Sequence, residues 1–193
     1  MSSSSMAGFF HEQVETVVDK QRVKVSDHTK SYVVNVLTEY SHAEMLHQQN
    51  NSDTLAMLYL RSQQVPAEER VRLLRRLGDM ALCISGFFAD SLNRKVVDLD
   101  YYIQMGGGAY GALAATFEQK RDAEVFVELY DEMARKFSTL VEVLNEVSEG
   151  VSGRDQSMLR IYDRWLKTGS DRMHRMLVER GVLPNMTIKR TAQ

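Results

Sequence analysis

Apolar residues recur three and four positions apart along most of this chain, which is the spacing of one face of an α-helix. The first run extends from Phe9 to Val18 and the second from Tyr32 to Tyr40. Ser26 or Asp27 is expected to cap the second run, because either side chain can accept a hydrogen bond from a free backbone N–H of the first turn. The pattern predicts two amphipathic helices at the start of the chain.

Turn and capping signals divide the rest of the chain into further helices. Pro66 is expected in the first helical position of one of them, where a missing N–H is tolerated. The expected segments are a short helix from Thr54 to Ser62, a helix from Pro66 to about Leu92 with Gly86 as a kink position, a glycine-rich helix from Asp98 to Phe117, a helix from Ala123 to Glu146, and a last helix from about Asp155 to Arg180. No run alternates with the period of a strand. We therefore predict an all-α fold, a single compact bundle of about seven helices with the glycine-rich and last helices at its centre.

The composition and charge of the chain indicate how far the domain extends and which kinds of partner it can bind. The chain has 193 residues with two prolines and is 44% hydrophobic, which is typical of one helical domain with its own core. We expect a disordered tail at residues 1–8, a single helical domain over residues 9–184 and a polar tail at residues 185–193. The formal net charge of −2 gives the whole chain no bias toward nucleic acid or an anionic membrane.

The cysteine content and the apolar runs bear on the cellular compartment. The single cysteine, Cys83, cannot form an internal disulfide, which favours a reducing cytoplasm. The longest strongly apolar run extends from Met80 to Ala89, about ten residues, whereas a membrane-spanning helix needs about 20. We expect a soluble cytoplasmic protein that binds a protein partner or itself, and neither nucleic acid nor membrane.

The glycine-rich helix loses almost all side-chain bulk at its middle, around the sequence Gly106-Gly-Gly-Ala-Tyr-Gly111. Each glycine in a helix interior costs roughly 1 kcal/mol relative to alanine, so a close neighbour is expected to compensate. We predict that Gly107, Gly108 and Gly111 contact another helix or a ligand, and that a β-carbon at any of them would intrude. Gly169 is a second such position and would form the floor of a pocket with them. The hydroxyl of Tyr110 is expected to donate a hydrogen bond outward from the edge of the core.

The helix after Pro66 carries a polar stripe on an otherwise apolar segment. Asp79, Cys83, Gly86 and Asp90 fall within about 60° of one another on the helical wheel. The stripe is either the solvent face of the helix or one wall of a polar cleft opposite the glycine-rich helix. In the second case a carboxylate would be desolvated, and its pKa would rise unless it is paired or hydrogen-bonded.

Two carboxylate–histidine pairs have the spacing of a dinuclear metal site. Glu39 with His42, and Asp171 with His174, lie three residues apart and so share a helix face. Di-iron and di-manganese bundles use such pairs on two helices and a further acid from each of two others. The remaining ligands would come from Asp79 or Asp90 and from Glu128 or Glu132. Many acids make such pairs common by chance, so the pairs predict a metal site only as an alternative, and no cofactor is our main expectation.

Two resemblances accompany these patterns. The run Gly106-Gly-Gly-Ala-Tyr-Gly111 is similar in kind to the glycine-rich kinked helix of heme oxygenases, which implies heme as an alternative cofactor, with His11 or His28 as its ligand. The segment from Leu77 to Leu92, with Asp98-Leu-Asp-Tyr-Tyr102 and residues 107–110, resembles an uncharacterised family of all-helical bacterial proteins. The second resemblance implies no activity.

No complete catalytic motif is present in the sequence. The chain has no nucleophile elbow, phosphate loop or dinucleotide fingerprint. The arginine-rich run from Glu69 to Arg76 is expected to be an ion-paired solvent face. The small-residue faces and the absence of a convergent reactive set favour a non-catalytic helical interaction or regulatory module that associates with itself. A heme-oxygenase-like heme binder or a di-metal carboxylate bundle is the alternative.

Overall fold

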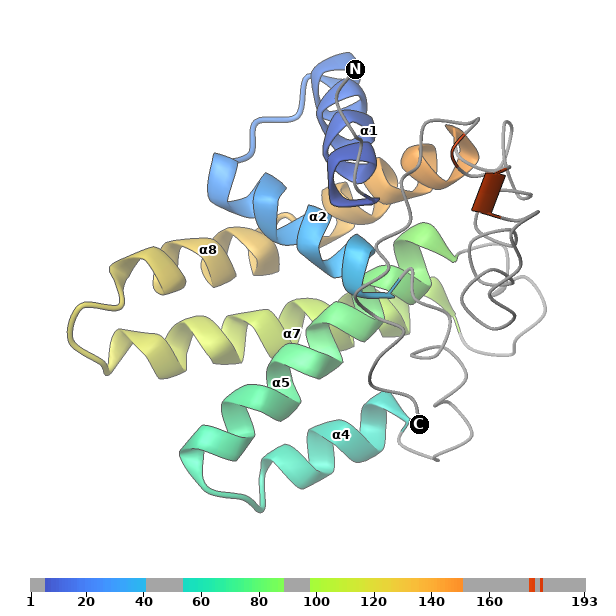
Figure 1. The fold of residues 1–193 in the computed structure, drawn as a ribbon. Coiled ribbons are helices and arrows are strands. Elements are labelled where there is room, and N and C mark those ends of the chain that lie inside the picture. Colours follow the sequence, from blue (N-terminus) through green and yellow to red (C-terminus); the bar gives the residue numbers. More distant parts are fainter. Residues whose placement is uncertain (1–5, 41–53, 89–97, 151–173, 176–177, 179–193) are drawn as a thin grey trace.

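The computed structural model describes residues 6–40, 54–88, 98–150, 174, 175 and 178 (Figure 1). The regular structure of these residues is helical throughout and includes no strand. The helices are α1 (Met6–Gln21), α2 (Asp27–Tyr40), α4 (Leu55–Ser62), α5 (Ala67–Leu82), the π-helix η2 (Cys83–Phe87), α7 (Leu99–Glu118) and α8 (Glu124–Arg135), followed by a helical run over residues 137–150. The predicted compact all-α fold is confirmed. The predicted last helix lies almost entirely outside the described residues.

Helices α1 and α2 form an antiparallel pair at one end of the molecule. The residue that caps α2 is Ser26, whose Oγ accepts a hydrogen bond from the backbone N–H of Thr29 at 3.2 Å. The inward face of α1 includes Phe10, which is fully buried and meets Phe87 of η2 edge-on with ring centres 5.9 Å apart. The pair is thus joined to the rest of the core by apolar packing.

Helix α4 is short and packs beside α5. Thr54 caps α4 by accepting a hydrogen bond from the backbone N–H of Met57 at 3.2 Å. Pro66 is not the first helical residue of α5, as the sequence analysis expects, but its N-cap. Its ψ of 158° is extended, so the helix begins one residue later, at Ala67.

Helix α5 continues directly into the π-helix η2, which contains Gly86. The backbone N–H of Phe88 donates to the carbonyl of Cys83 at 3.0 Å, a wider turn than that of an α-helix. A β-carbon at Gly86 would lie 2.7 Å from Cβ of Leu144. The wide turn and the missing side chain let the helical run over residues 137–150 pass close to the end of α5.

The segment after the glycine-rich helix contains two helices where the apolar spacing predicts one. Helix α8 ends at Arg135, Lys136 leaves the helical region with φ −104° and ψ 16°, and helix resumes at residue 137. The apolar spacing continues across this break through Met133, Phe137 and Leu140, which are all buried. Periodicity alone therefore could not reveal the break.

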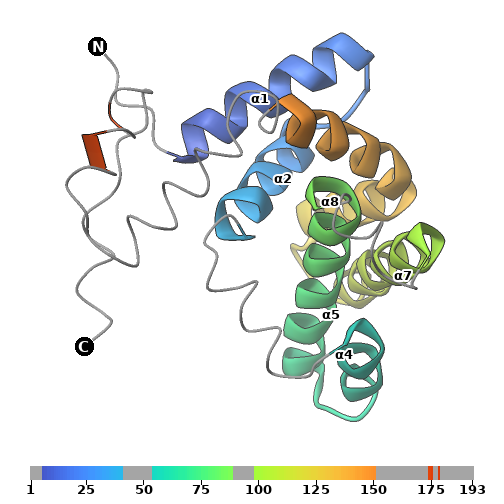
Figure 2. The ribbon, with the colours of Figure 1, turned by 90° about the vertical axis from the view of Figure 1, so that its right-hand side faces the viewer.

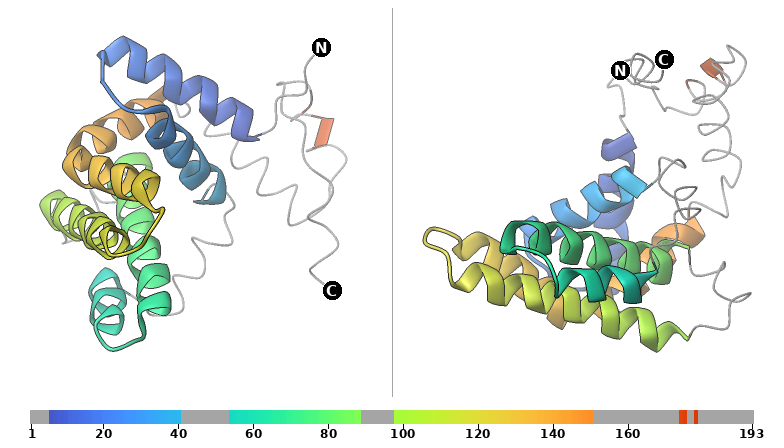
Figure 3. Two further views of the ribbon diagram at one scale, coloured as in Figure 1. Left: turned by 90° about the vertical axis from the view of Figure 1, so that its left-hand side faces the viewer. Right: turned by 90° about the horizontal axis from the view of Figure 1, so that it is seen from below.

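The helices are arranged around one apolar core. Figure 2 and the left view of Figure 3 place α1 and α4 at opposite ends, with α5, α7 and α8 between them. Helices α7 and α8 run antiparallel side by side, and the connection between them projects beyond the other helices in Figure 1 and in the right view of Figure 3. None of the described helices combines the length and apolar character that a membrane-spanning helix requires.

Candidate functional site

Asp79 of α5 is a buried carboxylate that joins three helices. Only 3% of its surface is exposed. Tyr32 of α2 and Tyr110 of α7 both donate their hydroxyl protons to its Oδ1, at 2.7 and 2.8 Å. The Nε of Arg75, one turn earlier on α5, lies 3.6 Å from Oδ2. The carboxylate therefore connects α2 and α7 to α5 through polar contacts inside the core.

Burial dominates the electrostatics of Asp79. It raises the pKa of the carboxyl to about 6, although hydrogen bonds from Tyr32 and Tyr110 and the charge of Arg75 lower it, and the charge of Glu39 adds to the rise. Burial also raises the pKa of both tyrosines, so their hydroxyls remain donors at neutral pH. Two neutral donors satisfy the carboxylate without restoring its ordinary acidity.

The polar stripe on this helix does not face solvent. Asp79, Cys83 and Gly86 are all buried, which contradicts the interpretation as a solvent face, and Asp90 lies outside the described residues. Cys83 is fully buried and packs with Val36 and Tyr40 of α2. Burial raises the pKa of its thiol, and a protonated thiol in apolar surroundings is a packing group rather than a nucleophile.

Aromatic rings enclose the carboxylate. Tyr130 of α8 stacks on Tyr110 with ring centres 6.0 Å apart and meets Tyr32 edge-on at 5.7 Å. The guanidinium of Arg75 lies over the ring of Tyr32, 5.8 Å from its centre. A β-carbon at Gly78 would lie 2.7 Å from Cε1 of Tyr110. Gly78 therefore makes room for the ring that reaches Asp79.

The close approach on the glycine-rich helix falls at a different glycine from those predicted. A β-carbon at Gly106 would lie 2.2 Å from Cζ of Phe137 and 2.8 Å from Cβ of Ala81. At Gly107 and Gly111 it would make ordinary contacts at 3.6 and 3.9 Å, and at Gly108, which is exposed, it would meet nothing within 4 Å. The predicted contact with another helix therefore holds for Gly107 and Gly111, which face Ala134 of α8, but the predicted intrusion is wrong for Gly107, Gly108 and Gly111. Gly169 lies outside the described residues.

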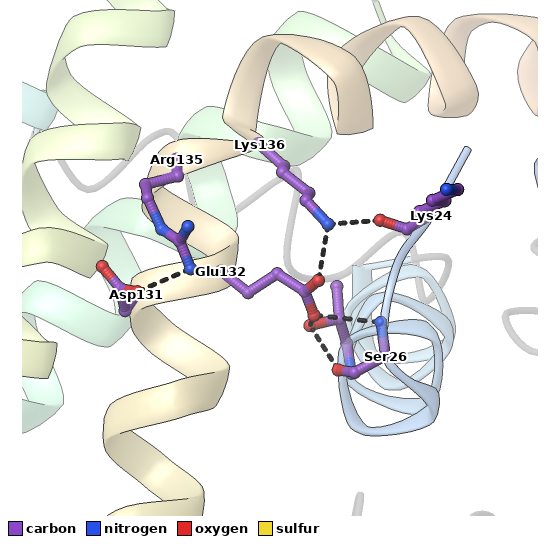
Figure 4. A network of polar contacts seen from close by, with 7 residues as sticks. Lys24, Ser26, Asp131, Glu132, Arg135 and Lys136 are labelled. Atoms are coloured by element: carbon purple, nitrogen blue, oxygen red, sulfur yellow. Dashed lines mark hydrogen bonds and ion pairs between the residues drawn. The ribbon is translucent and has the colours of Figure 1, made fainter.

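Glu132 of α8 makes a second polar contact with α2, at its N-terminus (Figure 4). Its Oε2 accepts hydrogen bonds from the backbone N–H of Ser26 at 3.0 Å and from Oγ1 of Thr29 at 2.6 Å. Lys136 donates to Oε1 at 2.7 Å and also to the carbonyl of Lys24. Burial alone would raise the pKa of Glu132, but the hydrogen bonds from Lys136, Ser26 and Thr29 outweigh it and lower the pKa to about 2.

The residues considered as cofactor ligands are not brought together where the structure describes them. His42 and Asp171 lie outside the described residues, Glu39 is exposed and His174 is half-buried. Among the described residues, no three His, Cys, Asp or Glu side chains are grouped closely enough to hold a metal ion. The heme candidates also lie at the surface: His11 is exposed with its Nδ1 3.8 Å from Glu15, and His28 is exposed at the start of α2. Neither histidine is buried against α7.

Helix α4 presents apolar side chains on two opposite faces. Leu55 and Leu58 are buried against the core. On the opposite side, 45% of Met57 and 59% of Leu60 is exposed, and Tyr59, of which 46% is exposed, lies at the edge of the buried face. A helix that is apolar on all sides is normally covered on all sides, and clustered exposed apolar residues are typical of contact surfaces. The outward face of α4, defined by Met57 and Leu60, is therefore a candidate interaction surface.

Both features carry signals that the sequence analysis could have used. Asp79 stands within an apolar segment, and a carboxylate that enters a core needs donors, which indicates that some tyrosines donate inward. Tyr110 does so, contrary to the expectation that it donates outward from the edge of the core. For α4 the signal is its composition: only one of its eight residues, Arg61, is charged. Such a helix leaves an apolar face outside any one-sided contact.

A scan against protein-family models and searches of curated proteins and of solved structures find no match to this chain. Its function is therefore inferred from the geometry of its own residues.

Proposed function

We propose that this protein is a non-catalytic helical interaction module that associates with a second copy of itself through the outward face of α4. The observation that supports this proposal is the exposed apolar face of Met57 and Leu60 on α4, which lies at the end of the described helices opposite α1 (Figure 2). Burying such a face removes apolar surface from water, which is the main favourable term in most protein association.

The polar groups inside the fold are consistent with a structural role. Asp79 accepts hydrogen bonds from Tyr32 and Tyr110, and Glu132 accepts from residues at the start of α2. Both carboxylates bond to groups of the protein itself. In this proposal they fix α2 against α5, α7 and α8, and the contact with another molecule is made by α4.

A pair of matched substitutions tests the proposal. Leu60→Glu places a charge on the outward face of α4, and Leu99→Glu makes the same change at another exposed leucine, of which 39% is accessible, in the first turn of α7. Static light scattering over a range of concentrations gives the mass of each protein. We expect the wild-type and Leu99→Glu proteins to exceed the monomer mass of 22.1 kDa and Leu60→Glu to approach it. Circular dichroism checks that the variants retain the helical fold.

Two outcomes would overturn the proposal. A wild-type protein that is monomeric at all concentrations does not self-associate. A Leu60→Glu protein with the same mass as the wild type associates through a surface other than the outward face of α4.

A further inference from the structure

Helix α2 has two polar attachments to the helices that follow it, and they lie at different depths. At its N-terminus, the backbone N–H of Ser26 and the hydroxyl of Thr29 donate to the half-buried Glu132 (Figure 4). One turn further on, Tyr32 donates to Asp79, which is almost completely buried. The buried side chains of α2 beyond Tyr32 are apolar or aromatic: Val33, Val34, Val36, Leu37 and Tyr40.

The deeper attachment holds a charge that its neighbours compensate poorly. Both hydroxyl donors, from Tyr32 and Tyr110, are neutral and reach the same oxygen of Asp79. Arg75 lies 3.6 Å from the other oxygen, and its side chain is 51% exposed, so water weakens this ion pair. Among the described residues, this is the one ion pair of the arginine-rich run expected to form an ion-paired solvent face, and it reaches a buried carboxylate instead. A buried charge with so distant a partner favours a rearrangement that admits water.

Asp79 is the member of its cluster that changes charge between pH 4 and pH 8. Burial raises its pKa to about 6, whereas burial raises the pKa of the surrounding tyrosines and of the Cys83 thiol, which therefore stay neutral in this range. The negative charge of Glu39 opposes ionisation of Asp79 further. The titratable and charged groups around Asp79 and its neighbours are Tyr32, Glu39 and Tyr40 on α2, Arg75 and Arg76 on α5, Cys83 in η2, Tyr110 on α7 and Tyr130 on α8.

The carboxylate is covered less deeply on its α2 side than on its α7 side. Tyr110 is fully buried, and α7 packs along both α5 and α8. Tyr32 is half-buried, and the half-exposed Arg75 lies over its ring, 5.8 Å from the centre. Movement of α2 would therefore bring water to Asp79 with less disruption of the core than movement of α7.

We propose that ionisation of Asp79 opens the part of α2 that follows Tyr32 away from α5, while Glu132 holds the N-terminus of α2 in place as a pivot. Protonation of Asp79 closes the helix again. Burial alone would raise the pKa of Glu132, but its hydrogen bonds lower it to about 2, so the pivot keeps its charge where Asp79 titrates. This pH-dependent hinge does not depend on the contact made by α4.

Cys83 can report the opening directly. It is the single cysteine of the chain, is fully buried and packs with Val36 and Tyr40, which both lie in the part of α2 proposed to move. An aromatic disulfide reagent labels the thiol only while α2 is open. When closing is faster than labelling, the labelling rate divided by that of the urea-unfolded protein at the same pH is the opening equilibrium constant. The division also removes the pH dependence of thiol reactivity itself.

The hinge predicts how this opening constant changes with pH. In the wild type it should rise about 60-fold from pH 4 to pH 8, because opening returns the pKa of Asp79 from about 6 toward its ordinary value of 3.8. Asp79→Asn, which cannot ionise, should give a constant that does not change with pH. Asp19→Asn, a change at an exposed residue, should follow the wild type. A wild-type constant that is the same at pH 4 and pH 8 would overturn the proposal.

Urea separates a local opening from unfolding of the whole protein. A local opening exposes little surface, so labelling at low urea should be nearly independent of urea concentration and faster than global unfolding allows. If the opening constant equals the global unfolding constant from urea denaturation at every pH, Cys83 is uncovered only by complete unfolding, and the proposal is wrong. This comparison requires only the wild-type protein.

Glu132→Gln tests the pivot. Because the hinge keeps the contact of Glu132 in both the closed and the open state, this variant should leave the opening constant at pH 7 unchanged. If α2 instead detaches at both ends, loss of the charge should raise the constant about fivefold, and the hinge is wrong. Circular dichroism checks that each variant retains the helical fold.

Discussion

Asp79 and Glu132 both hold helix α2 in place, and their electrostatics are opposite. Each accepts two hydrogen bonds at a single oxygen, yet the pKa is about 6 for Asp79 and about 2 for Glu132. Asp79 is buried with its nearest cation, Arg75, at 3.6 Å. Glu132 is half-buried with Lys136 donating directly at 2.7 Å. Two differences thus separate the pKa values: Asp79 is more deeply buried than Glu132, and only Glu132 accepts directly from an ammonium group.

The two sites therefore respond to pH in opposite directions. The folded pKa of Asp79 lies above its ordinary value of 3.8, so its contribution to stability is complete below that pH and is lost as pH rises through about 6. The folded pKa of Glu132 lies below its ordinary value of 4.5, so its contribution is complete above that pH and is lost as pH falls through about 2. At neutral pH the ionisation of Asp79 therefore lowers the free energy of unfolding, whereas the ionisation of Glu132 raises it.

The largest expected effect comes from removing the charge at the buried site. Asp79→Asn keeps an oxygen that can accept from both tyrosines and cannot ionise. We expect the free energy of unfolding of the wild type to fall relative to that of this variant as pH rises from 4 to 8, by about 2.5 kcal/mol, since each unit of pKa shift corresponds to about 1.4 kcal/mol. Urea denaturation at pH 4, 5, 6, 7 and 8 measures the difference.

The exposed residue Asp19 provides a control for this experiment. Asp19→Asn should keep the pH profile of the wild type. Parallel profiles for the wild type and Asp79→Asn would mean that the buried carboxyl does not titrate in this range, and the contrast with Glu132 would disappear.

A smaller loss is expected when the tyrosine that reaches Asp79 is displaced. In Gly78→Ala the new β-carbon would lie 2.7 to 2.9 Å from three ring atoms of Tyr110, a fully buried side chain. Overpacking of this kind lowers the free energy of unfolding by about 1 to 3 kcal/mol. The higher helix propensity of alanine raises it by about 1 kcal/mol. Urea denaturation at pH 7 should show a net loss of about 1 to 2 kcal/mol. A gain in stability would show that the ring moves aside without cost.

The half-buried site should give a still smaller loss. Glu132→Gln removes the charge that Lys136 contacts while retaining an oxygen acceptor, and we expect it to lower the free energy of unfolding at pH 7 by about 1 kcal/mol. The loss should persist at pH 5 and shrink as pH approaches about 2, the pKa of Glu132. Asp131→Asn, which breaks a pair with Arg135 on the same helix (Figure 4), should change stability by less than about 0.5 kcal/mol because that pair is exposed. Equal effects of the two variants would contradict the special role of Glu132.

These contrasts show what the sequence could and could not predict. Helix α2 and its Ser26 cap were predictable because apolar spacing and capping are local. The break at Lys136 was not, because the apolar spacing continues across it through the buried residues Met133, Phe137 and Leu140. Asp79 could be singled out by its apolar neighbours. Its donors, 47 and 31 residues away, could not be identified, since which tyrosines meet it depends on how the helices pack.

The smallest expected effect comes from Gly108 of the glycine-rich helix, which lies on the face of α7 opposite the one that packs into the core. Consecutive helical residues point about 100° apart, so the sequence alone cannot say which of its glycines faces inward. In the structure Gly106 faces inward and Gly108 faces open space. Gly108→Ala should therefore raise the free energy of unfolding by up to about 1 kcal/mol through helix propensity, without altering its pH profile. Gly106→Ala should lower it, because Cβ of Ala81 leaves no room for a methyl group. Thermal melts of the two variants at pH 7 decide this, and a lower melting temperature for Gly108→Ala would mean that another surface lies against that face of the helix.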